Sequence, residues 1–107
     1  IMLRIETVNG QRIKVYDNGG KTIDRYTVVY LDEPEELWNG SEYFVPAKPR
    51  TFACTGMNGA PYWPQGFCQH GYALAGPHLG HRILFADLPE DCQKVVEQDT
   101  RPAEETR

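Results

Sequence analysis

Apolar and polar residues alternate along the first third of the chain, with the two-residue period of a half-buried β-strand. The alternation is clearest at 3–8 and 11–16, and Asn9-Gly10 between them is typical of a tight hairpin turn. Segment 22–31 is rich in β-branched and aromatic residues, so it predicts the longest strand. We therefore expect three antiparallel strands in a meander.

Further along, shorter apolar segments predict more strands, at 41–46, 51–55 and 82–86. Segment 87–98 has a proline near its start, acidic residues in its first turn and an apolar stripe, which is the pattern of an amphipathic helix. Together these elements predict an α+β domain, an antiparallel sheet of about five strands with one C-terminal helix packed on it. An open barrel with the helix plugging one end is the alternative.

The length of 107 residues suits a single core. We expect one domain over 1–97 and a polar, flexible tail over 98–107. The density of glycine and proline in 56–71 excludes a long regular element there and predicts a loop. Loops of this length inside a small domain are often functional.

The net charge of −4 argues against a nucleic-acid partner, because neutralising phosphates requires a basic surface. A local basic patch of Lys14, Arg25, Lys48 and Arg50 is the weakest of the functional hypotheses. The longest apolar runs are too short to cross a bilayer, and no signal-peptide pattern is present, so no membrane association is expected. Three scattered cysteines favour free thiols and a cytoplasmic setting.

Known catalytic and cofactor-binding motifs are absent from the sequence, which favours a binding protein over an enzyme. Cys68, His70, His78 and His81 lie close together in the chain. Their spacing differs from the paired Cys and His spacings of zinc sites, so neither a metal nor a cofactor is expected.

The hairpin in YDNGGKTIDRYT (16–27) raises a question about burial. If its turn centres within 18–20, Asp24 and Tyr26 share a sheet face with Ile13 and Val15, whereas a three-residue loop places them on the opposite face. A carboxylate on an apolar face must be paired or hydrogen-bonded, because burying an uncompensated charge is costly.

Two interpretations of this acid remain open. Asp24, Arg25 and Tyr26 could line a polar pocket near the turn. In the favoured alternative, Asp24 sits at the sheet rim and accepts backbone N–H groups of the glycine-rich turn.

Aromatic residues gather in the middle of the chain: Trp38, Tyr43, Phe44, Tyr62, Trp63, Phe67 and Tyr72. Exposed aromatic side chains beside glycine and proline could form a recognition surface. Core filling is the favoured alternative, with Trp63 and Phe67 anchoring the loop and His70 in solvent.

Three blocks, KVYDNGGKTIDRYTVVY, GAPYWPQGF and HLGHRILFADLPEDCQKVV, together resemble a group of small proteins of unknown function from bacteriophages, prophages and bacterial genomes. The shared features are a Y-D-N-G-G-x-T-x-D-R-Y-T block, a P-Q-G-F loop and a D-L-P-E-D-C-Q helix start. The resemblance implies a phage-associated protein of the host cytoplasm, and it transfers no catalytic residue.

The favoured hypothesis is a binding or accessory module for a host protein or a small ligand. The alternative is a small enzyme or ligand-sequestering protein with a pocket between the 16–26 hairpin and the 64–70 loop. The candidate binding residues are Asp24, Arg25, Tyr26, Gln65, Phe67 and His70.

Overall fold

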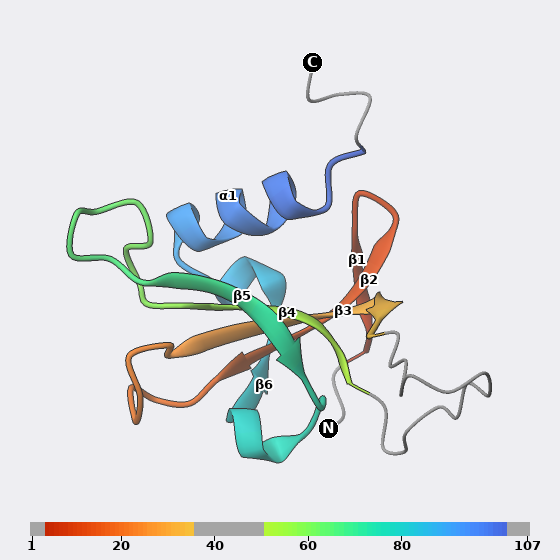
Figure 1. The fold of residues 1–107 in the computed structure, drawn as a ribbon, viewed down its shortest axis with the longest axis horizontal. Coiled ribbons are helices and arrows are strands. Elements are labelled where there is room, and N and C mark those ends of the chain that lie inside the picture. Colours follow the sequence, from red (N-terminus) through yellow and green to blue (C-terminus); the bar gives the residue numbers. More distant parts are fainter. Residues whose placement is uncertain (1–3, 36–50, 103–107) are drawn as a thin grey trace, which may run out of the picture.

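The computed structural model describes residues 4–35 and 51–102. Within them the elements follow in the order β1 (Glu6–Val8), β2 (Gln11–Asp17), β3 (Tyr26–Pro34), β4 (Phe52–Met57), β5 (Cys68–Ala73), the 3₁₀ turn η1 (Pro77–Leu79), β6 (His81–Ile83), the 3₁₀ turn η2 (Phe85–Asp87) and α1 (Glu90–Asp99). Figure 1 shows the helix lying across one face of the sheet. The predicted α+β fold is confirmed, whereas the barrel alternative is wrong because the sheet stays open.

The sheet has the strand order β1-β2-β3-β4-β5, and all its pairs are antiparallel. β1 and β6 divide one edge of β2 between them: β1 pairs with its first half and β6 with its second. At the other end, β5 pairs with β4 through six consecutive residue pairs without an irregularity. β5 is therefore an edge strand, in view across the front of the molecule in Figure 1.

The β2–β3 register confirms the predicted alternation. Ile13 lies opposite Tyr30, and Val15 lies opposite Val28, so these side chains share one face. β3 begins at Tyr26 rather than at residue 22, where the sequence predicted its start, because residues 18–25 form the connection between β2 and β3.

Side chains at the start of this connection hold its glycines. Asp17 Oδ1 accepts the Gly19 N–H at 2.8 Å, and Asn18 Oδ1 accepts the Gly20 N–H at 2.8 Å. Both glycines have positive φ, which residues with a side chain rarely adopt. The turn chemistry expected of Asp24 is thus supplied by Asp17 and Asn18.

The main error of the sequence-based prediction concerns 56–71. β4 continues to Met57 and β5 begins at Cys68, so only the residues between them form a loop. β5 escaped detection because five of its six residues are exposed and Gly71 interrupts them, which leaves no apolar alternation. Segment 82–86 divides into the end of β6 and the start of a 3₁₀ turn, and the predicted strand 41–46 lies outside the described residues.

Helix α1 and the sheet face beneath it enclose the core, which consists of Ile13, Val15, Tyr26, Val28, Tyr30, Met57, Leu88, Cys92, Val95 and Val96. The helical members are the apolar stripe that the sequence predicts. Burial of each large side chain contributes about 1.5–3 kcal/mol, so the helix is held mainly by this face. No helix of the described residues has the length and apolar character needed to cross a membrane.

The β1–β2 turn fastens the C-terminal end of α1. Asn9 has φ 51°, and its Nδ2 donates to Glu97 O and to Thr100 Oγ1, each at 3.1 Å. Thr100 is buried and donates to Val96 O at 2.8 Å. The ordered fold thus extends through Thr100, beyond residue 98, where we expected the tail to begin.

We predict that Gly80→Ala destabilises the fold, whereas Gly71→Ala does not. Gly80 has φ 120°, and a Cβ there would lie 2.4 Å from the backbone oxygen of Asp17. Gly71 lies outside the left-handed region, and no atom stands within 4 Å of its Cβ position. The expected loss for Gly80→Ala exceeds about 1 kcal/mol. Urea unfolding measures both variants, and equal stability would contradict the steric argument.

Candidate functional site

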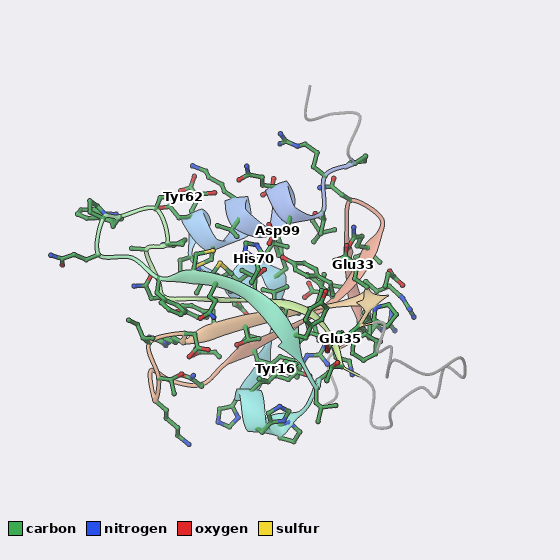
Figure 2. All side chains as sticks on the ribbon, viewed as in Figure 1. Tyr16, Glu33, Glu35, Tyr62, His70 and Asp99 are labelled. Atoms are coloured by element: carbon green, nitrogen blue, oxygen red, sulfur yellow. The ribbon has the colours of Figure 1, made fainter. Side chains whose placement is uncertain are left out.

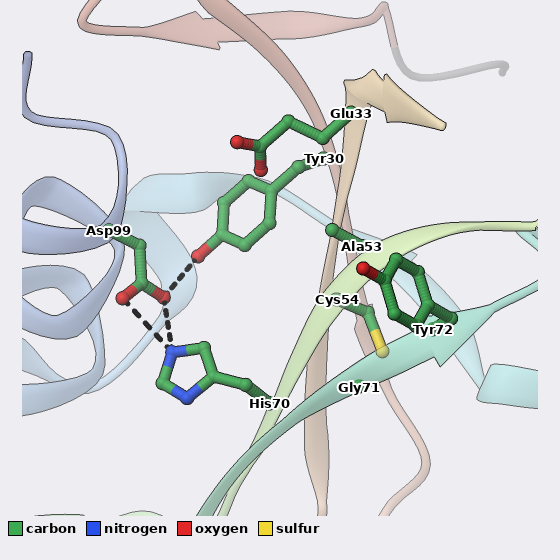
Figure 3. A pocket seen from close by; sticks show the side chains of 8 residues that line it. All are labelled: Tyr30, Glu33, Ala53, Cys54, His70, Gly71, Tyr72 and Asp99. Carbon is green, nitrogen blue, oxygen red and sulfur yellow. Dashed lines mark hydrogen bonds and ion pairs between the residues drawn. The ribbon is translucent and has the colours of Figure 1, made fainter. Parts of the chain in front are cut away.

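Asp99, the last residue of α1, links the helix to three strands. Its Oδ2 accepts hydrogen bonds from Tyr30 Oη of β3 at 2.7 Å and from Thr55 Oγ1 of β4 at 2.8 Å. Both Asp99 carboxylate oxygens lie 3.0 Å from Nε2 of His70, on β5 (Figure 3). Thr55 and His70 are direct partners in the β4–β5 register, so the sheet itself positions this row of donors.

The position of this carboxylate is electrostatically unfavourable. A helix C-terminus carries partial negative charge, and the last turn of α1 contains no basic residue. Donors from the sheet compensate for it. Burial raises the pKa of Tyr30 well above its ordinary value, and the nearby negative charge of Asp99 raises it further. The phenol therefore remains protonated and keeps donating.

His70 is held by this carboxylate but stays open to solvent. Its side chain is 62% exposed, compared with 21% for Asp99. Because a carboxylate only accepts hydrogen bonds, Nε2 carries the proton. Nδ1 forms no hydrogen bond to a described residue. An imidazole with its proton on Nε2 alone has Nδ1 as an acceptor, here on the exposed side of β5.

The Asp99 pocket, an open hollow of about 300 Å³, lies beside this cluster and is lined by Tyr30, Glu33, Ala53, Cys54, His70, Gly71, Tyr72 and Asp99. Figure 3 shows the rings of Tyr30 and Tyr72 and the carboxylates of Glu33 and Asp99 around it. The pocket combines aromatic surface with two acidic groups.

The Asp24 pocket, of about 250 Å³, is lined by Asp24, Thr27, Cys54, Gly56, Gln69, His70, Gly71, Tyr72, Ala73 and Leu79. Gly56 and Gln69 alternate with the residues that face the helix, so this pocket opens on the opposite face of β4 and β5. Asp24 reaches it because Gly56 has no side chain: a Cβ there would lie 3.1 Å from Asp24 Cβ.

The structure brings together only two of the six predicted site residues. Asp24 and His70 both line the Asp24 pocket, but the His70 imidazole turns to Asp99 on the other face. Asp24 precedes β3, so it does not point to the apolar side as the favoured registers implied. Its Oδ1 accepts a hydrogen bond from the Thr22 hydroxyl, and no turn N–H reaches it within the described chain.

The other four candidates do not line either pocket. Arg25 pairs with Asp17 at 2.8 Å, and its guanidinium lies 5.1 Å from the ring centre of Tyr26, which is buried in the core. Gln65 is exposed and Phe67 half-buried in the loop. The single pocket between hairpin and loop is thus not formed by these residues.

Core filling does not describe the loop aromatics. Trp63 is 68% exposed and Tyr62 is 55% exposed, so Trp63 does not anchor the loop. Figure 2 shows Tyr62 on the loop at the left of the view, away from His70 and Asp99. Neither side chain lines the Asp99 pocket or the Asp24 pocket.

Sequence reasoning missed Tyr30, Glu33, Thr55 and Asp99, and it named Tyr72 only as part of a possible aromatic recognition surface. Asp99 fell within the expected tail, and Tyr30 and Thr55 resemble ordinary strand residues. One signal was present: the last helical turn ends in acids where a basic residue is favourable.

Among the described residues, the cysteine and histidine side chains do not cluster into a metal site. In the ranges 4–35 and 51–102 no group of three or more His, Cys, Asp or Glu side chains is arranged to hold a metal ion. The thiols are free: Cys68 is exposed, Cys54 half-buried, and Cys92 buried with its Sγ 3.2 Å from Asn58 O. Burial raises the pKa of Cys92 to about 11 and also raises the pKa of Cys54 and of Cys68.

Comparison of the chain with protein-family models, with curated proteins and with solved structures finds no match. The resemblance to phage and prophage proteins therefore stays a prediction, and the function has to be argued from the geometry.

We predict that Asp99→Asn lowers the free energy of unfolding by about 1–3 kcal/mol, the cost of leaving a buried donor unsatisfied. Removing the charge from the helix terminus returns only about 0.3–1 kcal/mol, so the loss dominates. Glu97→Gln, an exposed change on the same helix, is the control and should be nearly neutral. Chemical denaturation compares them, and an Asp99→Asn protein as stable as the parent would contradict the assigned contacts.

We also predict two classes of thiol. At pH 8, a disulfide reagent such as DTNB should modify Cys68 rapidly and Cys92 at least about tenfold more slowly, because Cys92 is buried and has a raised pKa. Cys68→Ser should remove the rapid phase, while Cys92→Ala should leave it unchanged. Rapid modification of Cys92 in the folded protein would show that its surroundings are open.

Proposed function

We propose that this chain is a binding module whose Asp99 pocket takes a positively charged group of its ligand, an amine or a guanidinium. The observation that supports this proposal is the charge of the residues that line the two pockets. Asp24, Glu33 and Asp99 line the two pockets, and no described lining residue is a lysine or arginine. The ligand is a small molecule or a side chain of a partner protein.

Several acidic groups elsewhere in the described structure have cationic partners. Asp17 pairs with Arg25, Asp32 pairs with Arg12 at 2.7 Å, and Lys94 lies 3.7 Å from Glu90. Within 4–35 and 51–102, neither Asp24 nor Glu33 forms an ion pair, and the partner of Asp99 is the exposed imidazole of His70. Each pocket is therefore lined by a carboxylate without an ion-pair partner among the described residues, Glu33 in one and Asp24 in the other; elsewhere Glu6, Glu35, Asp87 and Glu97 also lack one.

The Asp99 pocket offers three features that a cation prefers. The helix C-terminus adds partial negative charge to that of the carboxylate. Among the residues that the structure describes, His70 alone donates to Asp99 Oδ1, which leaves a lone pair of this oxygen free of described donors. The rings of Tyr30 and Tyr72 provide faces for a cation–π contact. A volume of about 300 Å³ suits one charged group rather than a large cofactor.

The second candidate is acid–base chemistry, which the His70–Asp99 contact favours because a carboxylate orients the imidazole. The nearby thiols support binding instead. Burial raises the pKa of Cys54 and of Cys68, whereas a nucleophilic cysteine has a lowered pKa. With no activated nucleophile beside His70 in the described chain, binding is the simpler function.

Titration with argininamide, followed by amide NMR shifts, tests this proposal. We expect saturable shifts at His70, Gly71 and Tyr72, weakened by salt because the contact is ionic. Glu33→Gln should raise the Kd by about threefold to fivefold, the effect of one partly exposed ion pair. Glu90→Gln, which removes an exposed acid outside the pocket linings, is the matched control and should leave the Kd unchanged.

Both compounds are used with an acetylated α-amine, so that the guanidinium is the only charge of argininamide. Citrullinamide then has nearly the same shape without the charge, so it should not bind. Equal shifts with citrullinamide, or no saturable shift with argininamide, would overturn the proposal.

A further inference from the structure

β5 has the properties of an unprotected edge strand. Among the described strands it pairs with β4 alone, and its first five residues are exposed. Edge strands in natural proteins are commonly blunted by lysine, proline or a β-bulge, because their free N–H and C=O groups bind other chains. The sequence of β5, CQHGYA, contains neither residue, and the β4–β5 register has no bulge. The backbone N–H and C=O groups on the side of β5 away from β4 are therefore available, among the described strands, to pair with another chain.

The two acidic pockets flank the same strand. Both are lined by His70, Gly71 and Tyr72, one on each face of the sheet. Asp99 and Glu33 lie on the helix side of β5, and Asp24 lies on the other side. Any chain that pairs with β5 therefore runs between two negatively charged hollows.

Gly71 opens the way to the more distant carboxylate. Asp24 stands over Gly56 of β4, one strand inward from β5. An added strand would lie a further 4.7–4.9 Å out from β5, as neighbouring strands do. No atom lies within 4 Å of the Cβ position of Gly71, and Gly71 lines the same pocket as Asp24, so a long side chain of the added strand has room to pass over β5 at this glycine toward Asp24.

We propose that β5 receives an extended segment of a partner protein as an additional strand, and that this segment carries two adjacent basic residues. Neighbouring residues of a strand point to opposite faces. The residue beside His70 would therefore direct its cation to Asp99 and Glu33, and the residue beside Gly71 would direct its cation to Asp24. This inference rests on the proposed function and names its partner, in the binding mode known as β-strand addition.

Charge selects this occupant over a second copy of the chain. Two copies paired through β5 would bring together two sets of the same uncompensated carboxylates, which disfavours the dimer. A basic segment neutralises them, and the net charge of −4 attracts it.

Two capped octapeptides of threonine and valine test the spacing. One has two adjacent central arginines, and the other has the same composition with one residue between the arginines. The adjacent isomer should bind about threefold to fivefold more tightly, because only it places a cation on each face. Equal Kd values would show that charge alone is recognised and would overturn the proposal.

The backbone contribution is tested by N-methylation of the adjacent isomer, at its odd-numbered residues or at its even-numbered residues. Strand pairing uses one edge of the peptide, so one version should lose binding and the other should keep it. The parent peptide should also slow hydrogen exchange of β5 amides. Retained binding by both methylated versions would exclude strand addition.

Gly71→Val supplies the matched variant, because the site has room for a side chain and a β-branched residue suits a strand. It should abolish the preference for the adjacent isomer while thermal unfolding shows an intact fold. A preference that survives would contradict the route to Asp24.

Two further results separate the possible failures. Argininamide binding without a spacing preference would leave the proposed function standing and reject strand addition. No binding of argininamide or of either peptide would reject both. Sedimentation could instead show that the peptide-free protein is a dimer whose β5 amides are protected from hydrogen exchange. That result would show that the edge of β5 binds a second copy of the chain, and it would overturn the proposal.

Discussion

The contact of the Asp99 carboxylate with the sheet is the interaction on which the rest of this structure depends. Apolar packing alone would let α1 slide along its face of the sheet, because hydrophobic contact has no direction. Hydrogen bonds from Tyr30, Thr55 and His70 fix the end of the helix over three strands. Asn9 holds the same end from the β1–β2 turn. The register of helix and sheet, and the Asp99 pocket beside them, follow from this one carboxylate.

That arrangement carries an electrostatic cost. A neutral residue at the end of α1 would avoid repulsion from the helix C-terminus, but it would lose hydrogen bonds that the carboxylate accepts from the sheet. Local rules of stability are most often broken at functional sites, where the compensation comes from elsewhere in the fold. Here the compensation comes from the Tyr30 phenol, which burial keeps protonated, and the result is a carboxylate with a free lone pair beside two aromatic rings.

The distribution of charge relates this site to the sheet edge. Asp17 and Asp32 on the β2–β3 hairpin and Glu90 at the start of α1 are paired with arginine or lysine, so they contribute little to any external field. The acids beside β4 and β5 lack such partners in the described structure, and they occur on both faces of an edge strand with free backbone groups. The proposed cation binding and the proposed strand addition would therefore use the same surface, at β5.

The sequence by itself determined the fold class, the presence of the first strands, and the apolar stripe of α1, because these depend on local periodicity and turn chemistry. It left the register of the second hairpin open and did not reveal β5, whose exposed residues and central glycine show no alternation. Among the residues lining the pockets it indicated Asp24 and His70 as site candidates, and Tyr72 as part of a possible recognition surface. Tertiary structure decided the rest. Tyr30, Thr55, His70 and Asp99 are spread over 70 positions of the chain, and only strand pairing and the docking of the helix bring them together. No local sequence pattern predicts these hydrogen bonds, because the donors come from three strands and the acceptor from the end of a helix.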